Sequence, residues 1–211
     1  MKGLDKFTSS RWFPAVLVVV SLALPLGLSR FWVHVAVEVL ISSLFAMSFT
    51  LLYGWVGQLS FGQAAFFGTG AYGVALMATK TSAPFFVCLL VGVLLGGLLA
   101  FVTGFLVVRL AGIYFAIMTV VVSQATFFVF FNWYDFTGGD NGIQGIFPPG
   151  ILKDPYAYYY FSWCIVALSL VLYYKILSSP FGNSLRAIRE NMERATFIGI
   201  KVRLHMHIAF V

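Results

Sequence analysis

Charged residues are scarce in this sequence. Thirteen Lys and Arg and seven Asp and Glu make up 9% of the 211 residues, whereas 61% are hydrophobic and the mean hydropathy is +0.95. An ordinary soluble domain has about a quarter charged residues, because polar side chains must cover its surface. The composition therefore excludes a soluble globule, and we expect a lipid bilayer to surround most of the chain.

Several chemical motifs are also absent. The only cysteines, Cys88 and Cys164, stand inside apolar runs, so no disulfide framework and no metal site is expected. No H-E-x-x-H motif, nucleophile elbow or paired carboxylates occur in the apolar runs, which argues against a membrane-embedded enzyme. A phosphate-binding G-x-x-x-x-G-K-[ST] loop is missing as well, so we expect the chain to bind no cofactor and to hydrolyse no ATP itself.

Long apolar stretches dominate what is present. A helix needs about 20 residues to cross the hydrocarbon core of a bilayer. The sequence predicts an all-α fold, a polytopic bundle of transmembrane helices with six spans and the start of a seventh, which begins near His205 and is cut off at Val211. The first span is interpreted as a retained signal-anchor helix rather than a cleaved signal peptide. The six predicted spans are residues 12–28, 31–53, 55–79, 84–108, 110–131 and 156–174.

The basic residues predict how the chain is oriented. Lys and Arg near span ends are retained on the cytoplasmic side. With a cytoplasmic amino terminus, only Arg30, Lys80 and Lys153 lie outside, and the other ten basic residues lie inside. The net charge of +6 is thus explained by membrane orientation, and no nucleic-acid partner is expected. Residues 132–155 then form an extracytoplasmic loop, and residues 178–203 form a cytoplasmic loop.

Glycine is concentrated in the third predicted span, together with polar side chains. Such a density of glycine weakens a helix, and irregular backbone at membrane depth is tolerated where it is packed in protein or lines a water-filled cavity. Two interpretations stay open: a broken segment beside a translocation path, or a continuous helix packed closely on its neighbours. The candidate path residues are Gly57, Gln58, Ser60, Gly62 and Gln63.

Two further patterns concern helix packing. Gly92, Gly96, Ala100 and Gly104 recur every four residues in the fourth span, which predicts a smooth face for close contact with another helix. In the second span His34 and Glu38 share one helix face. An intramembrane carboxylate is costly, so this pair either satisfies itself structurally or contributes to a pathway.

The cytoplasmic segment is the most informative part of the sequence. Pro180 and Gly182 are residues that separate helices. Asn183 or Ser184 is expected to cap a following amphipathic helix that is bounded by Gly199. Glu193-Arg194-Ala195 followed by Gly199 resembles the EAA-x-x-x-G coupling loop of ABC importer permeases, with Arg194 in place of the usual second alanine. The wider pattern Ser-Pro-Phe-Gly, Arg-Ala-Ile-Arg-Glu-Asn and Gly-Ile-Lys-Val resembles the branched-chain amino acid permease family. The candidate coupling residues are Arg186, Arg189, Glu190, Glu193, Ala195 and Gly199.

Three other passages, residues 52–72, 109–119 and 137–143, are similar to the same family, and together they cover most of the chain from residue 50 onward. The third lies in the external loop. Its candidate residues Thr137, Gly138, Gly139 and Asp140 either contribute to an outer gate or a docking site, or form a plain cluster of turn residues.

The resemblance implies a permease domain over residues 1–211 that is located in the bacterial inner membrane. It implies a homologous permease subunit, two cytoplasmic ATP-binding subunits that hydrolyse ATP, and a periplasmic substrate-binding protein as partners. The substrate is expected to be a branched-chain amino acid, with urea or a short amide as the alternative and an ion-coupled carrier or channel as a more distant one. Family members continue beyond this loop, so we expect the chain to be a fragment, a truncated product or half of a split permease.

Overall fold

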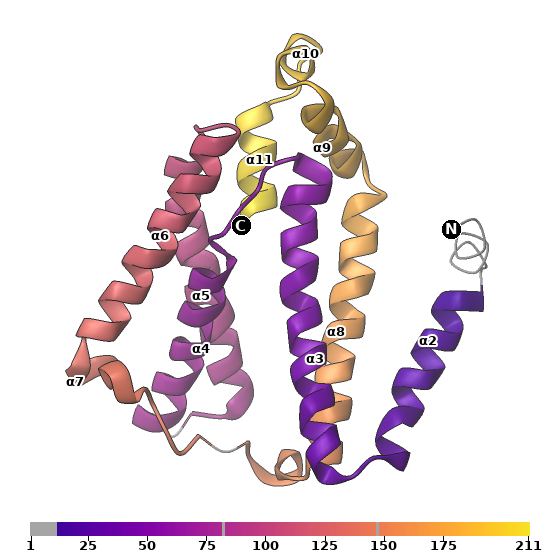
Figure 1. Ribbon diagram of the computed structural model, residues 1–211, viewed down its shortest axis with the longest axis vertical. Coiled ribbons are helices and arrows are strands. Elements are labelled where there is room, and N and C mark those ends of the chain that lie inside the picture. The colour runs from indigo at the N-terminus through magenta and orange to yellow at the C-terminus, as the bar shows by residue number, and fades with distance from the viewer. Residues whose placement is uncertain (1–11, 82, 147) are drawn as a thin grey trace. The chain divides into compact units, whose positions relative to one another are not determined.

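The computed structural model describes residues 12–81, 83–146 and 148–211 (Figure 1). Its regular elements within these ranges are all helices. The described residues form two compact units, one with residues 12–43 together with Pro149–Ser169, the other within Leu44–Pro148 and Leu170–Val211. The elements are α2 (Trp12–Ala23), η1 (Leu24–Gly27), α3 (Arg30–Thr50), η2 (Leu51–Val56), α4 (Gln63–Lys80), α5 (Phe85–Val107), α6 (Ile113–Asn132), α7 (Tyr134–Thr137), η3 (Gly139–Asn141), η4 (Gly150–Lys153), α8 (Pro155–Leu177), α9 (Pro180–Glu190), α10 (Met192–Phe197) and α11 (Val202–Phe210).

The prediction of an all-α protein with membrane-spanning helices is confirmed, but the count of six is not. Four described helices are long and apolar enough to cross a bilayer: Arg30–Val56, Phe85–Val107, Ile113–Asn132 and Pro155–Leu177. The predicted span 12–28 is interrupted because Pro25 lacks an N–H, and α2 passes into a 3-10 turn after Ala23. The predicted span 55–79 is interrupted because α4 does not begin until Gln63.

In the first unit, aromatic side chains of α8 hold the end of α2. Tyr159 packs with Val33 and Val37 of α3, and its hydroxyl donates to the carbonyl of Ser21 at 2.6 Å. The indole Nε1 of Trp163 donates to the hydroxyl of Ser21 at 2.9 Å. These bonds satisfy polar groups that otherwise have no water partner in lipid.

In the second unit, α4 and α5 approach each other through glycine. A Cβ at Gly92 would lie 2.7 Å from the carbonyl oxygen of Gly70, and one at Gly96 would lie 2.9 Å from that of Phe66. Further along α5, Gly104 leaves room for the ring of His207 on α11. The predicted small-residue face of α5 is therefore confirmed, and it serves two neighbouring helices.

One hydrophobic cluster of the second unit joins the helices of residues 178–203 to the apolar helices. Leu185 and Ile188, three residues apart on α9, are almost completely buried. They pack in one cluster with Val56 of η2, Phe115 of α6 and Phe210 of α11. The amphipathic pattern of this segment is thus used for packing onto the ends of the spans.

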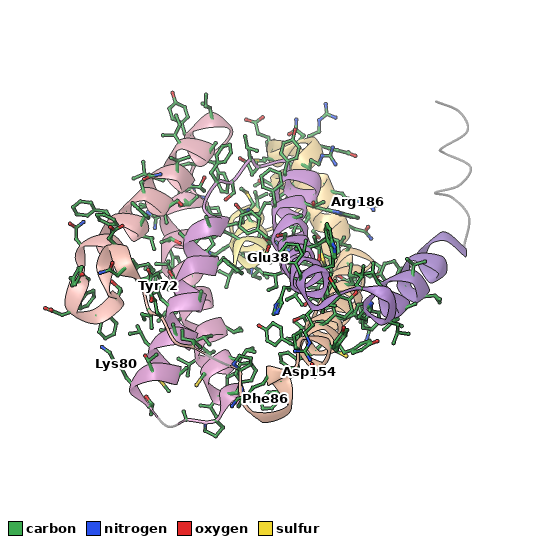
Figure 2. All side chains as sticks on the ribbon, turned by 60° about the horizontal axis from the view of Figure 1, so that its bottom comes forward. Glu38, Tyr72, Lys80, Phe86, Asp154 and Arg186 are labelled. Carbon is green, nitrogen blue, oxygen red and sulfur yellow. The ribbon has the colours of Figure 1, made fainter. Side chains whose placement is uncertain are left out.

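The pair His34 and Glu38 lies on α3 with both side chains exposed. Figure 2 labels Glu38, and among the described residues neither side chain makes a hydrogen bond or an ion pair. Structural pairing within the described chain therefore does not account for the carboxylate.

Candidate functional site

The glycine-rich segment is broken rather than continuous. Helix α3 ends in the π-helix η2, and Gly57 follows with a left-handed φ of 78°, a conformation that L side chains rarely adopt. The N–H of Gln58 closes the turn on the carbonyl of Leu52 at 3.1 Å. Residues 57–62 have no regular structure, and α4 begins at Gln63. The interpretation as one continuous helix is wrong.

Polar side chains satisfy the backbone of this break. The Oε1 atom of Gln58, which is 5% exposed, accepts the N–H of Gly112 at 3.1 Å. Thr119 of α6 accepts the N–H of Phe61 at 3.0 Å, and Ser60 accepts that of Gly62 at 3.3 Å. These bonds give Gln58 and Ser60 a structural purpose, because unpaired backbone groups are costly in lipid.

Gln63 differs from those two residues. It is 7% exposed, and its Nε2 has no hydrogen-bond partner in the described part of the chain. Gly57 and Gly62 flank the irregular segment and provide the positions where it leaves η2 and enters α4. The assignment of all five residues to a translocation path stays a prediction.

The helix predicted within residues 178–203 begins earlier than expected. Ser179 is its N-cap, with its hydroxyl accepting the N–H of Gly182 at 3.4 Å, and Pro180 occupies the first helical turn. The predicted cap at Asn183 or Ser184 is wrong, because Ser followed by Pro already starts the helix. Gly182 lies inside it, where a Cβ would collide with the carbonyl of Leu177.

The same segment forms two helices instead of one. Asn191 adopts an extended conformation after α9, and its side chain accepts the N–H of Arg194 at 2.9 Å to cap α10. Ala195 is 2% exposed and belongs to the hydrophobic cluster, while Glu190 and Glu193 are exposed. Gly199 follows α10 with a φ of 90°. A side-chain hydrogen bond to the backbone therefore decides where the helix breaks.

Two arginines of α9 contact the end of η2. The guanidinium of Arg189 donates to the carbonyl of Gly54 at 2.5 Å, and a Cβ at Gly57 would lie 3.0 Å from its Cγ. Arg186, labelled in Figure 2, places its guanidinium 4.0 Å from the ring centre of Trp55. The structure thus brings two of the predicted coupling residues against the start of the broken segment.

Sequence reasoning missed an exposed apolar pair beside these residues. Phe197 is 89% exposed at the end of α10, and Ile198 is 74% exposed next to it. Two adjacent large apolar residues in a segment predicted to lie outside the membrane are the signal that was available.

The residues predicted to lie in an external loop, Thr137 to Asp140, form a hydrogen-bonded turn. Thr137 is completely buried, and its hydroxyl contacts the carbonyls of Phe130 and Trp133 at 2.5 and 2.8 Å. The same oxygen accepts the N–H of Gly139 at 3.3 Å. Gly138 and Gly139 both have positive φ, at 78° and 54°. Turn formation therefore accounts for three of the four predicted residues, and Asp140 is left exposed at its end.

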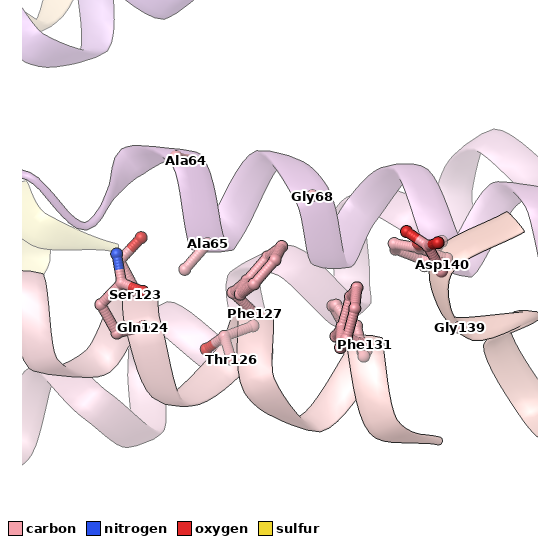
Figure 3. A pocket seen from close by; sticks show the side chains of 12 residues that line it. Ala64, Ala65, Gly68, Ser123, Gln124, Thr126, Phe127, Phe131, Gly139 and Asp140 are labelled. Atoms are coloured by element: carbon pink, nitrogen blue, oxygen red, sulfur yellow. The ribbon is translucent and has the colours of Figure 1, made fainter. Parts of the chain in front are cut away.

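A cavity of about 450 Å³ lies beside this turn, between α4, α6 and η3 (Figure 3). None of the five candidate path residues lines it. Small residues at the start of α4 make room for it, and polar side chains of α6 face it. The lining residues are Ala64, Ala65, Gly68, Tyr72, Ser123, Gln124, Thr126, Phe127, Phe130, Phe131, Gly139 and Asp140.

Comparison with known proteins decides the family. The family model described as the permease component of a branched-chain amino acid transport system matches residues 31–211. The chain belongs to this family. It is a family of transporter permeases, so this permease is not an enzyme, and its long apolar helices are those of a multi-pass membrane protein.

Curated relatives agree. The permease is 28% identical to the high-affinity branched-chain amino acid transport system permease protein LivM of Escherichia coli (strain K12), over 90% of this chain and 51% of that protein. It is 27% identical to the protein of the same name from Salmonella typhimurium, over 89% of this chain and 51% of that protein. The chain thus spans about half the length of the curated relatives it matches. No solved structure matches it.

Proposed function

We propose that this permease forms the translocation pathway of an ABC importer for branched-chain amino acids together with a second, homologous permease. Two cytoplasmic ATP-binding subunits drive it, and a periplasmic binding protein delivers the substrate. The observation that carries the proposal is the contact of Arg189 and Arg186 with the end of η2, which connects the cytoplasmic helices to the broken segment. The family match supports the importer class and the substrate.

The proposal includes six crossings with a cytoplasmic amino terminus. Helix α4 has 18 residues, which is about 27 Å at 1.5 Å per residue and slightly less than the hydrocarbon core. The irregular residues 57–62 add the missing length, so the break and α4 together make one outward crossing. Helices α9 and α10 then lie on the cytoplasmic side, where basic residues are retained.

In this topology Phe197 and Ile198 are the contact with an ATP-binding subunit. Large apolar side chains exposed to water are favourable binding anchors, because their burial removes apolar surface from water. The charged residues around them, Glu193 and Arg194, are exposed and form a polar rim. Movement of α10 is passed through α9 to Gly54 and the break.

The test is co-purification of the ATP-binding subunit from membranes in mild detergent. The double variant Phe197→Ser, Ile198→Ser is expected to lose the ATP-binding subunit while remaining folded. Tyr174→Ser removes a similarly exposed aromatic side chain from α8 and is the matched control, expected to retain the subunit. If an intact permease never binds an ATP-binding subunit, or if the double variant binds it as well as the control, the proposed arrangement is wrong.

A further inference from the structure

The cavity of the second unit has a composition that distinguishes it from a packing gap. On α4, Ala64, Ala65, Gly68 and Tyr72 share one face, and the first three are small. A Cβ added at Gly68 would meet no atom within 4 Å. The cavity is thus bordered by residues that leave space, in contrast to Gly70 and Gly73 of the same helix, which are packed tightly against α5.

Four polar side chains around the cavity lack a hydrogen-bond partner among the described residues. In the part of the chain that the structure describes, no hydrogen bond is made by the side chains of Ser123, Gln124 and Asp140 or by the hydroxyl of Tyr72. Thr126 by contrast donates to the carbonyl of Val122 at 2.8 Å. A free polar group at membrane depth is costly and marks a substrate or water pathway. These groups therefore indicate a hydrated or ligand-filled space.

The remaining wall is aromatic. Phe127 and Phe131 of α6 stand beside the cavity in Figure 3, and the ring of Phe130 lies 4.7 Å from that of Tyr72. Small-molecule sites in proteins combine such an apolar lining with a few polar groups that fix orientation. The aromatic wall suits an aliphatic side chain, and the polar groups suit a charged or amide head.

We propose that this cavity is a binding site for cargo on the outer half of the path, with a small zwitterion that carries an aliphatic side chain as its ligand. The proposal rests on the function proposed above and adds the site. Asp140, on the extracytoplasmic turn, attracts the ammonium group. After the molecule has moved inward, Ser123, Gln124 and Tyr72 offer hydrogen bonds to its carboxylate, and Phe127 and Phe131 contact the aliphatic part.

The length of the cavity indicates that the ligand makes these contacts one after the other. Ala64 and Tyr72 are eight residues apart on α4, or about 12 Å along the helix axis. Figure 3 shows Ser123 and Gln124 at one end of the lining and Asp140 at the other. One small amino acid is shorter than this segment of α4, so it contacts the two ends in turn. Asp140 is the earlier contact, and the Ser123 and Gln124 end is the later one.

The first experiment measures access without measuring transport. In a Cys88→Ala, Cys164→Ala background, Ser123→Cys is treated from the extracytoplasmic side with a small, membrane-impermeant, thiol-specific reagent. Val121→Cys lies two residues away on α6, is 50% exposed, and does not line the cavity, so it is the control. We expect labelling of Ser123→Cys, slowed several-fold by L-leucine, and none of Val121→Cys, because thiolates form only in contact with water.

The second experiment fills the cavity. Gly68→Leu places a side chain in the open space of the cavity. Gly97→Leu is the control: it adds the same side chain on α5, away from the cavity lining, where a Cβ also meets no atom within 4 Å. In the intact transporter in proteoliposomes, we expect Gly68→Leu to lower L-leucine uptake by about tenfold or more, because a filled pocket excludes its ligand. Gly97→Leu is expected to transport normally, and both are expected to retain the ATP-binding subunit.

The outcomes separate this inference from the proposed function. Equal reactivity of the two cysteines, labelling of Ser123→Cys that L-leucine does not slow, or normal uptake by Gly68→Leu overturns the cargo site while leaving the importer intact. Absence of L-leucine uptake by the unaltered transporter, with no ATP-binding subunit bound, instead overturns the proposed function.

Discussion

Arg189 and Gly54 are 135 residues apart in sequence, and the guanidinium of the first donates a hydrogen bond to the carbonyl of the second at 2.5 Å. Gly54 belongs to η2, which ends at Val56, directly before the left-handed Gly57. Helix α9 is thereby attached to the last turn before the broken segment. Any displacement of α9 acts on the backbone at that point.

Replacing Arg189 tests this attachment. Arg189→Ala is expected to reduce uptake several-fold while the ATP-binding subunit still co-purifies, because the bond to Gly54 is lost and the docking residues are unchanged. Since Arg189 is exposed, the stability cost is small, about 0.5–1.5 kcal/mol. Arg203→Ala removes an exposed basic residue of α11 and is the control for charge. Normal uptake by Arg189→Ala contradicts the attachment.

Substitution of Gly57 separates backbone strain from crowding. Gly57→Ala is expected to destabilise the permease by about 1–2 kcal/mol from left-handed strain, and further from its 3.0 Å approach to Arg189. Gly199→Ala has a similar φ of 90° but open space around its Cβ, so it carries the strain alone. Thermal unfolding in detergent measures both. Adding Arg189→Ala to Gly57→Ala is expected to remove the destabilisation that exceeds that of Gly199→Ala. If Gly57→Ala and Gly199→Ala lose equal stability, crowding by Arg189 is ruled out.

The contact between α4 and α5 predicts that two glycines of α5 differ in how much stability their substitution by alanine costs. Gly92→Ala puts a Cβ 2.7 Å from the carbonyl oxygen of Gly70, so a loss of about 1–3 kcal/mol is expected from overpacking. Gly97→Ala on the same helix meets no atom within 4 Å, and is expected to be neutral or to stabilise by up to about 1 kcal/mol. Unfolding temperatures that are equal for the two variants contradict the close approach.

The buried hydroxyl of Thr137 is expected to stabilise the turn of residues 137–140. Thr137→Val keeps the shape of the side chain but leaves the N–H of Gly139 without its acceptor, which costs about 1–3 kcal/mol. Thr103→Val loses only the bonds from the side chain to the carbonyls of Leu99 and Ala100 within α5, and is expected to be nearly neutral. In the proposed orientation this turn is extracytoplasmic, so proteolysis in spheroplasts measures the difference. Equal protease resistance contradicts the role of the buried hydroxyl.

Part of the fold was predictable because it depends on local composition. Apolar runs long enough to cross a bilayer predicted α3, α5, α6 and α8 within a few residues, since lipid requires helices there. The four-residue spacing of Gly92, Gly96, Ala100 and Gly104 predicted a contact face, because small residues on one side of a helix allow another helix to approach closely. The family was predicted from short motifs within residues 178–203 and in three other passages, and the family match confirms it.

Boundaries were harder, because single hydrogen bonds decide them. Ser179 and Asn191 each cap a helix, and both were available in the sequence, yet neighbouring residues of the same chemical type were equally plausible caps. The break at residues 57–62 was one of two open interpretations. Its stability comes from Gln58 and Thr119, which bond with backbone groups more than 50 residues away.

The sequence by itself determined that lipid surrounds this protein, that its regular elements are helices, and which family it belongs to, because hydropathy and motifs are carried by neighbouring residues. Tertiary structure alone decided that Arg189 reaches Gly54 and that Ser123, Gln124 and Asp140 face one cavity with the small residues of α4. The physical reason is that both features need segments from distant parts of the chain to lie side by side. That placement is decided by the close packing of helices. A local sequence pattern shows the contact face of one helix but does not show which helix packs against it.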